Sequence, residues 1–256
     1  RAGAPLEMIQ ALLRAAPWQV RHAMDSRGTP LHEALAYETT SLSVLAALLG
    51  ADEKLGAAGP TRATLQQDVD GFTPLHLLIR RRFQSHMLQE NPSSERSNIN
   101  SFMGILELLV KSSPEAVVIP DRGEYEESPI VYALKANIYS PMLGSEDATL
   151  SRIELQIYDM VACMLKHYPD AAHHVLNGYR GHYTALHSAV FHGRCTKTIE
   201  LLLRASPQSS YESALLANTQ GELPLHFCTM RGERPRTVQL LAKAAPQAIH
   251  KRDTSG

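Results

Sequence analysis

The apolar residues of this chain fall into short runs that stop at a shared signal. Five times, an apolar pair is followed by three further residues and then by proline. Because proline lacks a backbone N–H and clashes with the preceding turn of a helix, it ends a helix at that point. The pattern therefore predicts five apolar helices that close before Pro17, Pro114, Pro169, Pro207 and Pro246.

A four-residue pattern recurs along the same chain. Thr29-Pro30-Leu31-His32 returns, with small changes, at residues 73–76, 184–187 and 223–226, and a degenerate copy lies at 128–131. Threonine favours the N-cap of a helix and proline its first position, so each copy predicts the start of a short helix. The leucine is expected in the interior. The histidine is expected to hydrogen-bond turn backbone of its own or the adjoining repeat, because buried polar groups need partners.

Polar turns that contain glycine, such as Asp68 to Phe72, separate the proline-ended helices from the next copy. The unit is therefore a turn, a short helix, a loop and a longer helix. Recurrence of one such unit means that each copy buries its apolar face only by stacking on its neighbours. The T-P-L-H-x-A pattern resembles the ankyrin repeat. The resemblance implies an all-α fold, an ankyrin-repeat solenoid of about five helix-turn-helix units with inserted loops, and protein–protein interaction as its function.

The intervals between copies exceed the ankyrin period of about 33 residues, so every unit carries extra residues. Polar insertions at 84–100 and 139–149 are expected to form exposed, mobile loops. A third insertion, 52–67, follows a helix over 41–50 that lacks the proline ending. We expect one array over residues 1–256, and a piece of a longer protein. Its approximate parts are a partial helix in 1–24, units at 25–67, 68–120, 121–176, 177–217 and 218–252, and the start of another unit at 253–256.

Composition narrows the function classes. The formal net charge is −1 and the pI is about 6.9, so no basic field favours nucleic acid. No run approaches the ~18 apolar residues of a membrane span. The three cysteines, Cys163, Cys195 and Cys228, are scattered along the chain. Cys163 and Cys228 are typical of small core residues in a reducing compartment rather than of disulfides. An intracellular protein, cytoplasmic or nuclear, is expected.

Residues that could carry chemistry form no catalytic pattern. His173 and His174 have no cysteine or carboxylate at a metal-ligand spacing. Cys195 and His192 lie close together, but no third residue is placed to orient a nucleophile. We therefore expect no enzyme, no cofactor, no metal site and no small-molecule ligand.

In ankyrin arrays, the turn tips and the short helices form a concave face where partners usually dock. The resemblance therefore implies a partner site on the exposed residues of these segments, and aromatic residues and arginine are the usual energetic anchors. An alternative left open is that some of the aromatic residues instead cover the seams between repeats. The candidates are Tyr37, Phe72, Arg80, Arg81, Tyr125, Lys135, Tyr183, Phe191, His192, Glu222, Met230 and Arg231.

The partner is expected to be another protein or another domain of the same chain. The favoured function is a non-enzymatic scaffold or adaptor. The alternative is a regulatory array in a larger protein whose catalytic domain lies outside these residues.

Overall fold

The computed structural model describes residues 5–23, 28–36, 41–56, 62–86, 92–135, 152–177, 181–205, 212–231 and 235–254, and only the backbone of 84–86, 92–100 and 230–231. The chain divides into two compact units, Arg1–Gly123 and Glu124–Gly256. That all 256 residues form one array stays a prediction. None of the described helices combines the length and the apolar character needed to cross a membrane.

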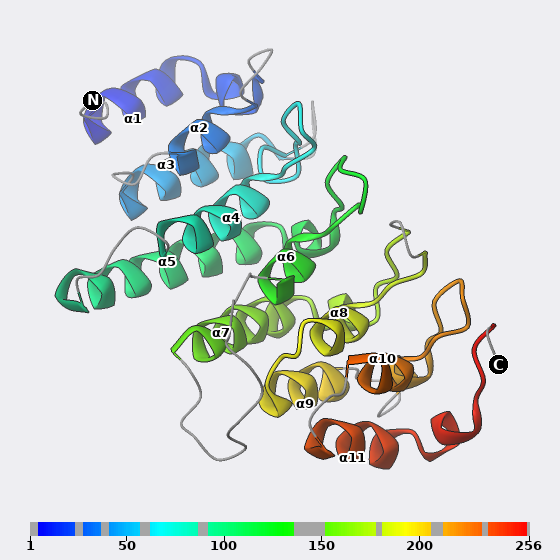
Figure 1. Ribbon diagram of the computed structural model, residues 1–256. Helices are drawn as coiled ribbons and strands as arrows, with labels where there is room; N and C mark the ends of the chain where they lie inside the picture. The colour runs from blue at the N-terminus through cyan, green and yellow to red at the C-terminus, as the bar shows by residue number, and fades with distance from the viewer. Residues whose placement is uncertain are drawn as a thin grey trace. The chain divides into compact units, whose positions relative to one another are not determined.

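The described residues form five pairs of a short and a longer helix, preceded by one unpaired helix (Figure 1). The short members are α2 (Pro30–Ala36), α4 (Pro74–His86), α6 (Pro129–Lys135), α8 (Ala185–Phe191) and α10 (Pro224–Arg231). Their partners are α3 (Leu42–Lys54), α5 (Pro92–Ser112), α7 (Arg152–His167), α9 (Thr196–Arg204) and α11 (Pro235–Ala244), and the unpaired helix is α1 (Leu6–Ala15). The prediction of an all-α fold of about five helix-turn-helix units is confirmed.

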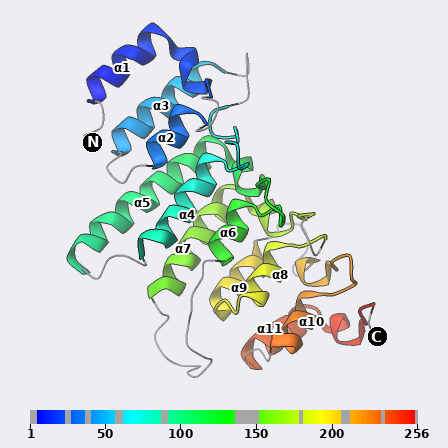
Figure 2. The ribbon, with the colours of Figure 1, turned by 45° about the horizontal axis from the view of Figure 1, so that its top comes forward.

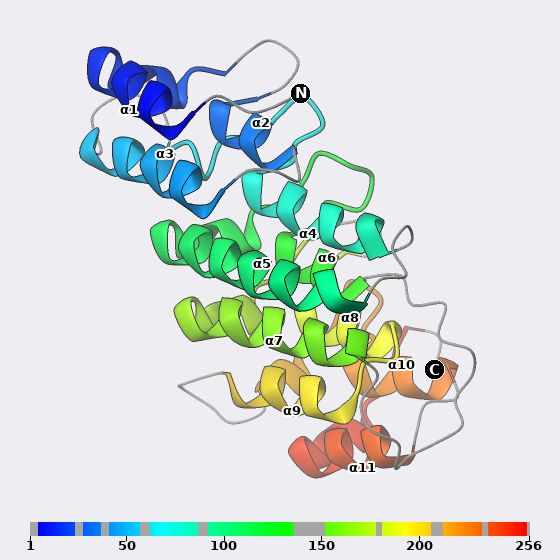
Figure 3. The same ribbon diagram turned by 90° about the vertical axis from the view of Figure 1, so that its left-hand side faces the viewer.

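Each unit has two layers of helices. In the first, α1, α3 and α5 lie side by side in one row (Figure 3), and α2 and α4 form the second row. In the other, α7, α9 and α11 form one row, and α6, α8 and α10 form the other (Figure 2). The apolar core lies between the rows, because each helix is apolar mainly on the side that faces the opposite row.

The leucine of the four-residue pattern lies in this core. Leu31, Leu75 and Leu186 are at most 1% exposed, as predicted. Leu225 departs from the prediction, since it is only half-buried. It belongs to the last helix pair, which has a described neighbouring pair on one side only.

The prolines end the long helices where the sequence predicts. The residue before proline leaves the helical region, with φ between −137° and −148° and ψ between 71° and 85° at Ala16, Ser113, Tyr168 and Ala245. Proline restricts its preceding residue in this way, because its ring clashes with the helical conformation there. Each proline then opens a 3₁₀ turn that the sequence reading missed: η1 (Pro17–Arg21), η2 (Pro114–Val118), η3 (Pro169–Ala172) and η5 (Pro246–His250). Pro207 lies outside the described residues.

The polar insertions do not all form loops. Residues 92–100 belong to α5, which begins at Pro92, and residues 84–86 belong to α4. The expectation of a loop over 84–100 was therefore wrong for these residues. Proline favours the first position of a helix, and the polar residues 93–98 that follow Pro92 continue α5. The insertion at 139–149 lies outside the described residues.

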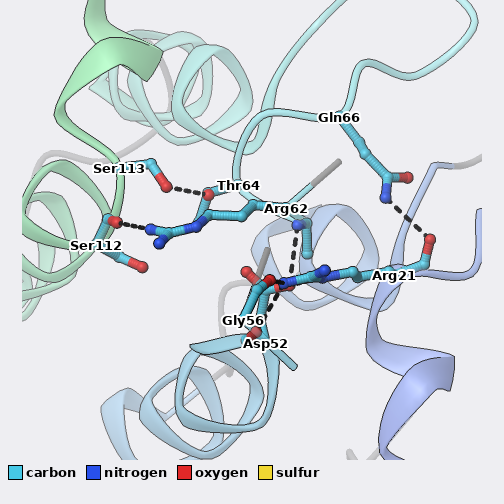
Figure 4. Close-up of polar contacts among 9 residues, drawn as sticks. Arg21, Asp52, Gly56, Arg62, Thr64, Gln66, Ser112 and Ser113 are labelled. Atoms are coloured by element: carbon cyan, nitrogen blue, oxygen red, sulfur yellow. Dashed lines mark hydrogen bonds and ion pairs between the residues drawn. The ribbon is translucent and has the colours of Figure 1, made fainter. Parts of the chain in front are cut away.

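The insertion after α3 is fixed by a buried ion pair. Arg21 Nε lies 2.5 Å from Asp52 Oδ1, and both side chains are 2% exposed (Figure 4). The same guanidinium donates to the carbonyl oxygens of Asp52 and Gly56 at 2.8 and 2.9 Å. Asp52 also accepts the backbone N–H of Ala63 at 3.2 Å. This network holds the end of α3 against η1 without the proline signal that the other long helices use.

Two further hydrogen bonds connect residues 62–64 to the end of α5. Thr64 Oγ1 and Ser113 Oγ are 2.5 Å apart, and Arg62 donates to the carbonyl oxygen of Ser112 at 2.8 Å (Figure 4). Gln66 donates back to the carbonyl oxygen of Arg21 at 3.0 Å. The insertion therefore ties η1, α3 and α5 of the first unit together through polar contacts.

We predict that Asp52→Asn lowers the free energy of unfolding by about 3–5 kcal/mol, because it leaves the buried guanidinium of Arg21 without its countercharge. Urea unfolding of the whole chain measures this. The control is Glu200→Gln in the exposed pair Arg204–Glu200, where the atoms are 3.9 Å apart and the cost should stay below about 1 kcal/mol. Equal losses in both variants would mean that the Arg21 pair is solvated.

Because equivalent leucines differ in burial, we expect their replacement by alanine to lower the free energy of unfolding by different amounts. Leu186→Ala should lower the free energy of unfolding by about 2–5 kcal/mol, because the side chain is fully buried. The loss at half-buried Leu225 should be smaller, since fewer contacts are removed. Chemical denaturation decides this, and a loss below about 1 kcal/mol at Leu186 would contradict the register of the repeats.

Candidate interaction face

Repeat histidines join the short helices α2, α8 and α10 to the turns that follow them. The backbone N–H of Thr29 donates to His32 Nδ1 at 3.1 Å, and the other ring nitrogen, Nε2, lies 3.0 Å from the carbonyl oxygen of Phe72. In the second unit, His187 Nε2 lies 3.2 Å from the carbonyl oxygen of Glu222, and His226 Nε2 lies 3.1 Å from that of Lys251. The predicted structural role of these histidines is confirmed.

Burial keeps the repeat histidine His187 neutral. Removal from water lowers the pKa of His187 from 6.5 to about 4, against the opposing effect of the Glu222 carbonyl. The same cause lowers the pKa of His32. Neutral rings suit this site, because Nδ1 must accept from the threonine N–H while Nε2–H donates to a carbonyl oxygen. Both nitrogens of His187 are thus engaged in the framework.

Backbone hydrogen bonds also stack the turns. The N–H of Arg122 donates to the carbonyl oxygen of Asp70 at 3.3 Å in the first unit. In the second unit, the N–H of Thr219 donates to the carbonyl oxygen of Gly181 at 3.4 Å. The approach is so close that a Cβ added at Gly71, whose φ is +84°, would lie 2.3 Å from the nitrogen of Arg122. Glycine is needed there for space as well as for conformation.

Two of the predicted partner residues lie in a seam between repeats. The ring of Tyr183 stacks on His187, with centroids 5.6 Å apart, and meets the edge of Phe227 at 6.2 Å. Phe191 also lies edge-on to Phe227, at 6.0 Å, and Phe227 is fully buried. These rings therefore connect α8 with α10, and the alternative of seam packing describes them better than a partner site.

Glu222 is also part of the framework. It is 8% exposed, and its carboxylate accepts from Asn218 Nδ2 at 2.7 Å, while its backbone N–H donates to Asn218 Oδ1 at 2.9 Å. As an exposed contact residue it was a wrong choice, because the turn before α10 folds around this side-chain pair.

One group of predicted residues combines exposure with a fixed position. Tyr125 is 52% exposed at the turn before α6, and Lys135 Nζ lies 5.3 Å from the centre of its ring. Lys135 also donates to both carboxylate oxygens of Glu127, at 2.8 and 3.0 Å. The lysine thus lies between an aromatic ring and a carboxylate, and this cation–π contact restrains the tyrosine.

A related pair lies in the first unit. The guanidinium carbon of Arg80 lies 5.0 Å from the centre of the Phe72 ring, and Arg80 is exposed. Phe72 itself is half-buried against His76, with ring centroids 5.8 Å apart. Arg81 donates to the carbonyl oxygen of Leu35 at 2.8 Å, so it braces α4 against α2. Of these predicted residues, Arg80 presents the most accessible side chain.

The remaining candidates are either half-buried or lie outside the described residues. His192 is half-buried, and its ring is edge-on to Phe191. Tyr37 lies outside the described residues, and so do the side chains of Met230 and Arg231. Val69, which was not among the candidates, is 57% exposed at the turn before α4.

Metal-ligating side chains are scattered over the described part of the chain. No group of three His, Cys, Asp or Glu side chains there could hold a metal ion. Cys228 is buried, as its interpretation as a small core residue requires, whereas Cys163, which was interpreted in the same way, is only half-buried. Cys195 is also buried. The thiol of Cys195 lies 3.2 Å from Thr198 Oγ1, inside the packing of α9.

Comparison with known proteins finds similarity among solved structures. No family model matches the chain, and no curated protein matches it. Among solved structures, the ankyrin repeat domain of Bcl-3, described as a unique member of the IkappaB protein family, is similar at 20% identity over 94% of this chain and 99% of that one, with a TM-score of 0.40.

The fold is that of ankyrin-type repeats. This conclusion rests on the five helix pairs, the buried pattern leucines and the histidine bonds between repeats, rather than on the distant likeness to one solved structure.

The lowered pKa of His187 predicts a pH-dependent stability. Between pH 6.5 and about 4 the unfolded chain binds a proton at this residue and the folded chain does not. The free energy of unfolding should therefore fall as the pH is lowered through this window, by about 3 kcal/mol at one site. Above pH 6.5 this contribution is constant.

The measurement is urea unfolding at several pH values for the parent chain and for His187→Gln, which has no titrating group at this position. The parent should show the steeper loss between pH 6.5 and 4. Parallel curves would contradict a neutral, buried imidazole. The other histidines contribute equally to both curves, so the difference isolates His187.

Proposed function

We propose that this chain is a protein-binding module of the scaffold or adaptor kind. Its partner contacts the turn before α6 and the exposed end of that helix, where Tyr125 and Lys135 lie. The proposal keeps the predicted short-helix side of the array. It leaves out Tyr183 and Phe191, which pack in a seam, and Glu222, which pairs with Asn218 in the turn before α10.

The observation that carries the proposal is the restrained exposure of Tyr125. A large ring that is 52% exposed contributes nothing to the core, and the cation–π contact with Lys135 limits its motion before any partner arrives. Binding then loses less side-chain entropy, which is how preorganised contacts gain affinity. Tyrosine is also among the residues enriched at interface hot spots.

The charge of the turn indicates the kind of partner. Glu124 and Glu126 are exposed on either side of Tyr125, and Lys135 pairs with Glu127. Two carboxylates beside one aromatic ring suit a protein segment that offers arginine or lysine, because guanidinium groups pair with carboxylates and stack on aromatic faces. A basic segment of another protein, or of another domain of the same polypeptide, is the proposed ligand.

We predict that Tyr125→Ala weakens binding of that partner by about 2 kcal/mol or more, as expected for a hot-spot residue, and leaves the unfolding midpoint nearly unchanged. The measurement is an affinity pull-down with the whole chain, followed by calorimetric titration of the captured partner. The matched control is Leu155→Ala on α7, which removes an apolar side chain of similar exposure, 47%, from a long helix.

A second test of the partner site replaces both Glu124 and Glu126 by lysine, which reverses the charge of the turn. It should weaken binding, with a strong dependence on salt concentration, because exposed charges act through a screened field. Full affinity in both Tyr125→Ala and the reversed turn would show that the partner site lies elsewhere.

A further inference from the structure

The long helices share a basic residue at one position of the repeat. In each of the five helices that end shortly before a proline, a lysine or arginine lies three residues ahead of that proline, and all five side chains are exposed. They are Arg14, Lys111, Lys166, Arg204 and Lys243. Four residues earlier, on the same side of each helix, the residue type varies. Those residues are Gln10, Glu107, Ala162, Glu200 and Gln239.

The end of a helix accounts for part of this regularity. The last carbonyl groups of a helix carry partial negative charge, so a cation in the last turn stabilises the helix by about 0.3–1 kcal/mol. Arg14 shows such a local role, since its Nε donates to the carbonyl oxygen of Gln10 at 3.3 Å. This effect explains one row of cations. It does not explain a second row, which lies at the opposite end of two helices.

The second row consists of Lys197 and Arg236. They lie in the first turn of α9 and α11, ten residues before the closing proline. Both are exposed, and neither first turn contains an acidic residue. Because the N-terminus of a helix carries partial positive charge, a cation there lowers the stability of the helix. A role outside the helix is the simplest account of these two residues.

In the second unit both rows lie on one surface, which we call the basic face. It is the outer side of α7, α9 and α11, which lie side by side (Figure 3). The buried residues of these helices, such as Leu202 and Leu203, occupy the opposite side. Five exposed cations outnumber the two carboxylates described among them, Asp159 and Glu200. The cations of the basic face are Lys166, Lys197, Arg204, Arg236 and Lys243.

The spacing of these cations suits an extended peptide. Packed helices lie about 8–10 Å apart, so Lys166, Arg204 and Lys243 form a row with roughly that interval. A polyproline II segment has three residues per turn and rises about 3.1 Å per residue, which places every third side chain on one side, about 9 Å apart. Carboxylates at every third residue would therefore meet one cation on each helix.

The same geometry favours a narrow ligand over a broad one. An anionic membrane would lie against the whole face, including Asp159 and Glu200. A single peptide can follow the row of cations and leave Asp159 to one side. Nucleic acid strands carry a charge about every 3.4 Å, so most of their phosphates would have no partner in a row with the helix spacing.

We propose that the basic face binds an acidic segment of another protein, extended across α7, α9 and α11 with a carboxylate at every third residue. The carboxylates pair with Lys166, Arg204 and Lys243, and Lys197 and Arg236 add attraction on α9 and α11. The proposal does not depend on the partner site at Tyr125, which lies at a turn and takes the opposite charge.

The first test compares two labelled peptides by fluorescence anisotropy with the whole chain at low salt. One has glutamate at every third position with serine between. The other has the same composition, with its glutamates consecutive. The spaced peptide should bind about threefold more tightly or better, because only its charges match the helix spacing. Equal affinities would overturn the proposal, since net charge alone would then decide binding.

The second test removes charge from the basic face. Arg204→Gln with Lys243→Gln should weaken binding of the spaced peptide about fivefold or more. The matched control, Lys251→Gln with Arg252→Gln, removes the same charge from exposed residues near the end of the unit and should bind as the parent does. Equal losses in both variants would contradict the proposal. So would a loss in Tyr125→Ala, which would place the peptide at the turn before α6.

The third test separates binding from stability. Lys197→Gln with Arg236→Gln removes cations from two helix N-termini, so the thermal unfolding midpoint should rise by ~2 °C while the peptide binds more weakly. A lower midpoint with unchanged binding would show that these cations serve the fold, and would contradict the proposal.

Two other polyanions are titrated in parallel, phosphatidylserine vesicles and single-stranded DNA. Both should bind more weakly than the spaced peptide. Tighter binding of either one, lost in the Arg204→Gln and Lys243→Gln variant, would mean that the basic face serves a membrane or a nucleic acid and that the proposal is wrong.

Discussion

The bond between a repeat histidine and the carbonyl of the next turn is the contact on which this fold depends. One imidazole accepts from the N–H of Thr29 and reaches the carbonyl of Phe72, so it fixes the start of one short helix relative to the start of the next. Burial makes both bonds costly to lose, since neither partner could return to water. Apolar stacking supplies the driving force, but it is not directional, and the histidine supplies the register.

The same histidine contact accounts for the position of the aromatic residues that precede the short helices. Phe72 and Tyr183 both precede the threonine of the pattern, and each ring lies on the histidine of its own repeat. A recurring aromatic at one repeat position is a framework feature. That regularity was visible in the sequence and could have separated these two residues from the candidates for partner binding. Tyr125 does not hold that place, and its ring remains exposed.

The first unit shows how the fold tolerates an irregular repeat. The closing proline is missing after α3, although the apolar pair Leu48-Leu49 is present and buried. There the pair Arg21–Asp52 and the bonds of residues 62–66 hold the returning chain instead. Such polar networks hold a single arrangement only when every member is satisfied. The buried polar residues Arg21, Asp52, Thr64 and Ser113 all take part in these bonds.

The sequence by itself determined the helix pairs, their closing prolines, the buried leucines and the role of the histidines. Each follows from local chemistry or from repetition, which tests every copy against the others. Only the tertiary structure decided that residues 92–100 extend α5, that Arg21 meets Asp52 across 31 positions, and that Phe191 and Glu222 turn inward while Tyr125 stays outside. These outcomes depend on which repeat lies beside a residue. Side-chain identity does not encode that neighbour when insertions of different lengths separate the repeats.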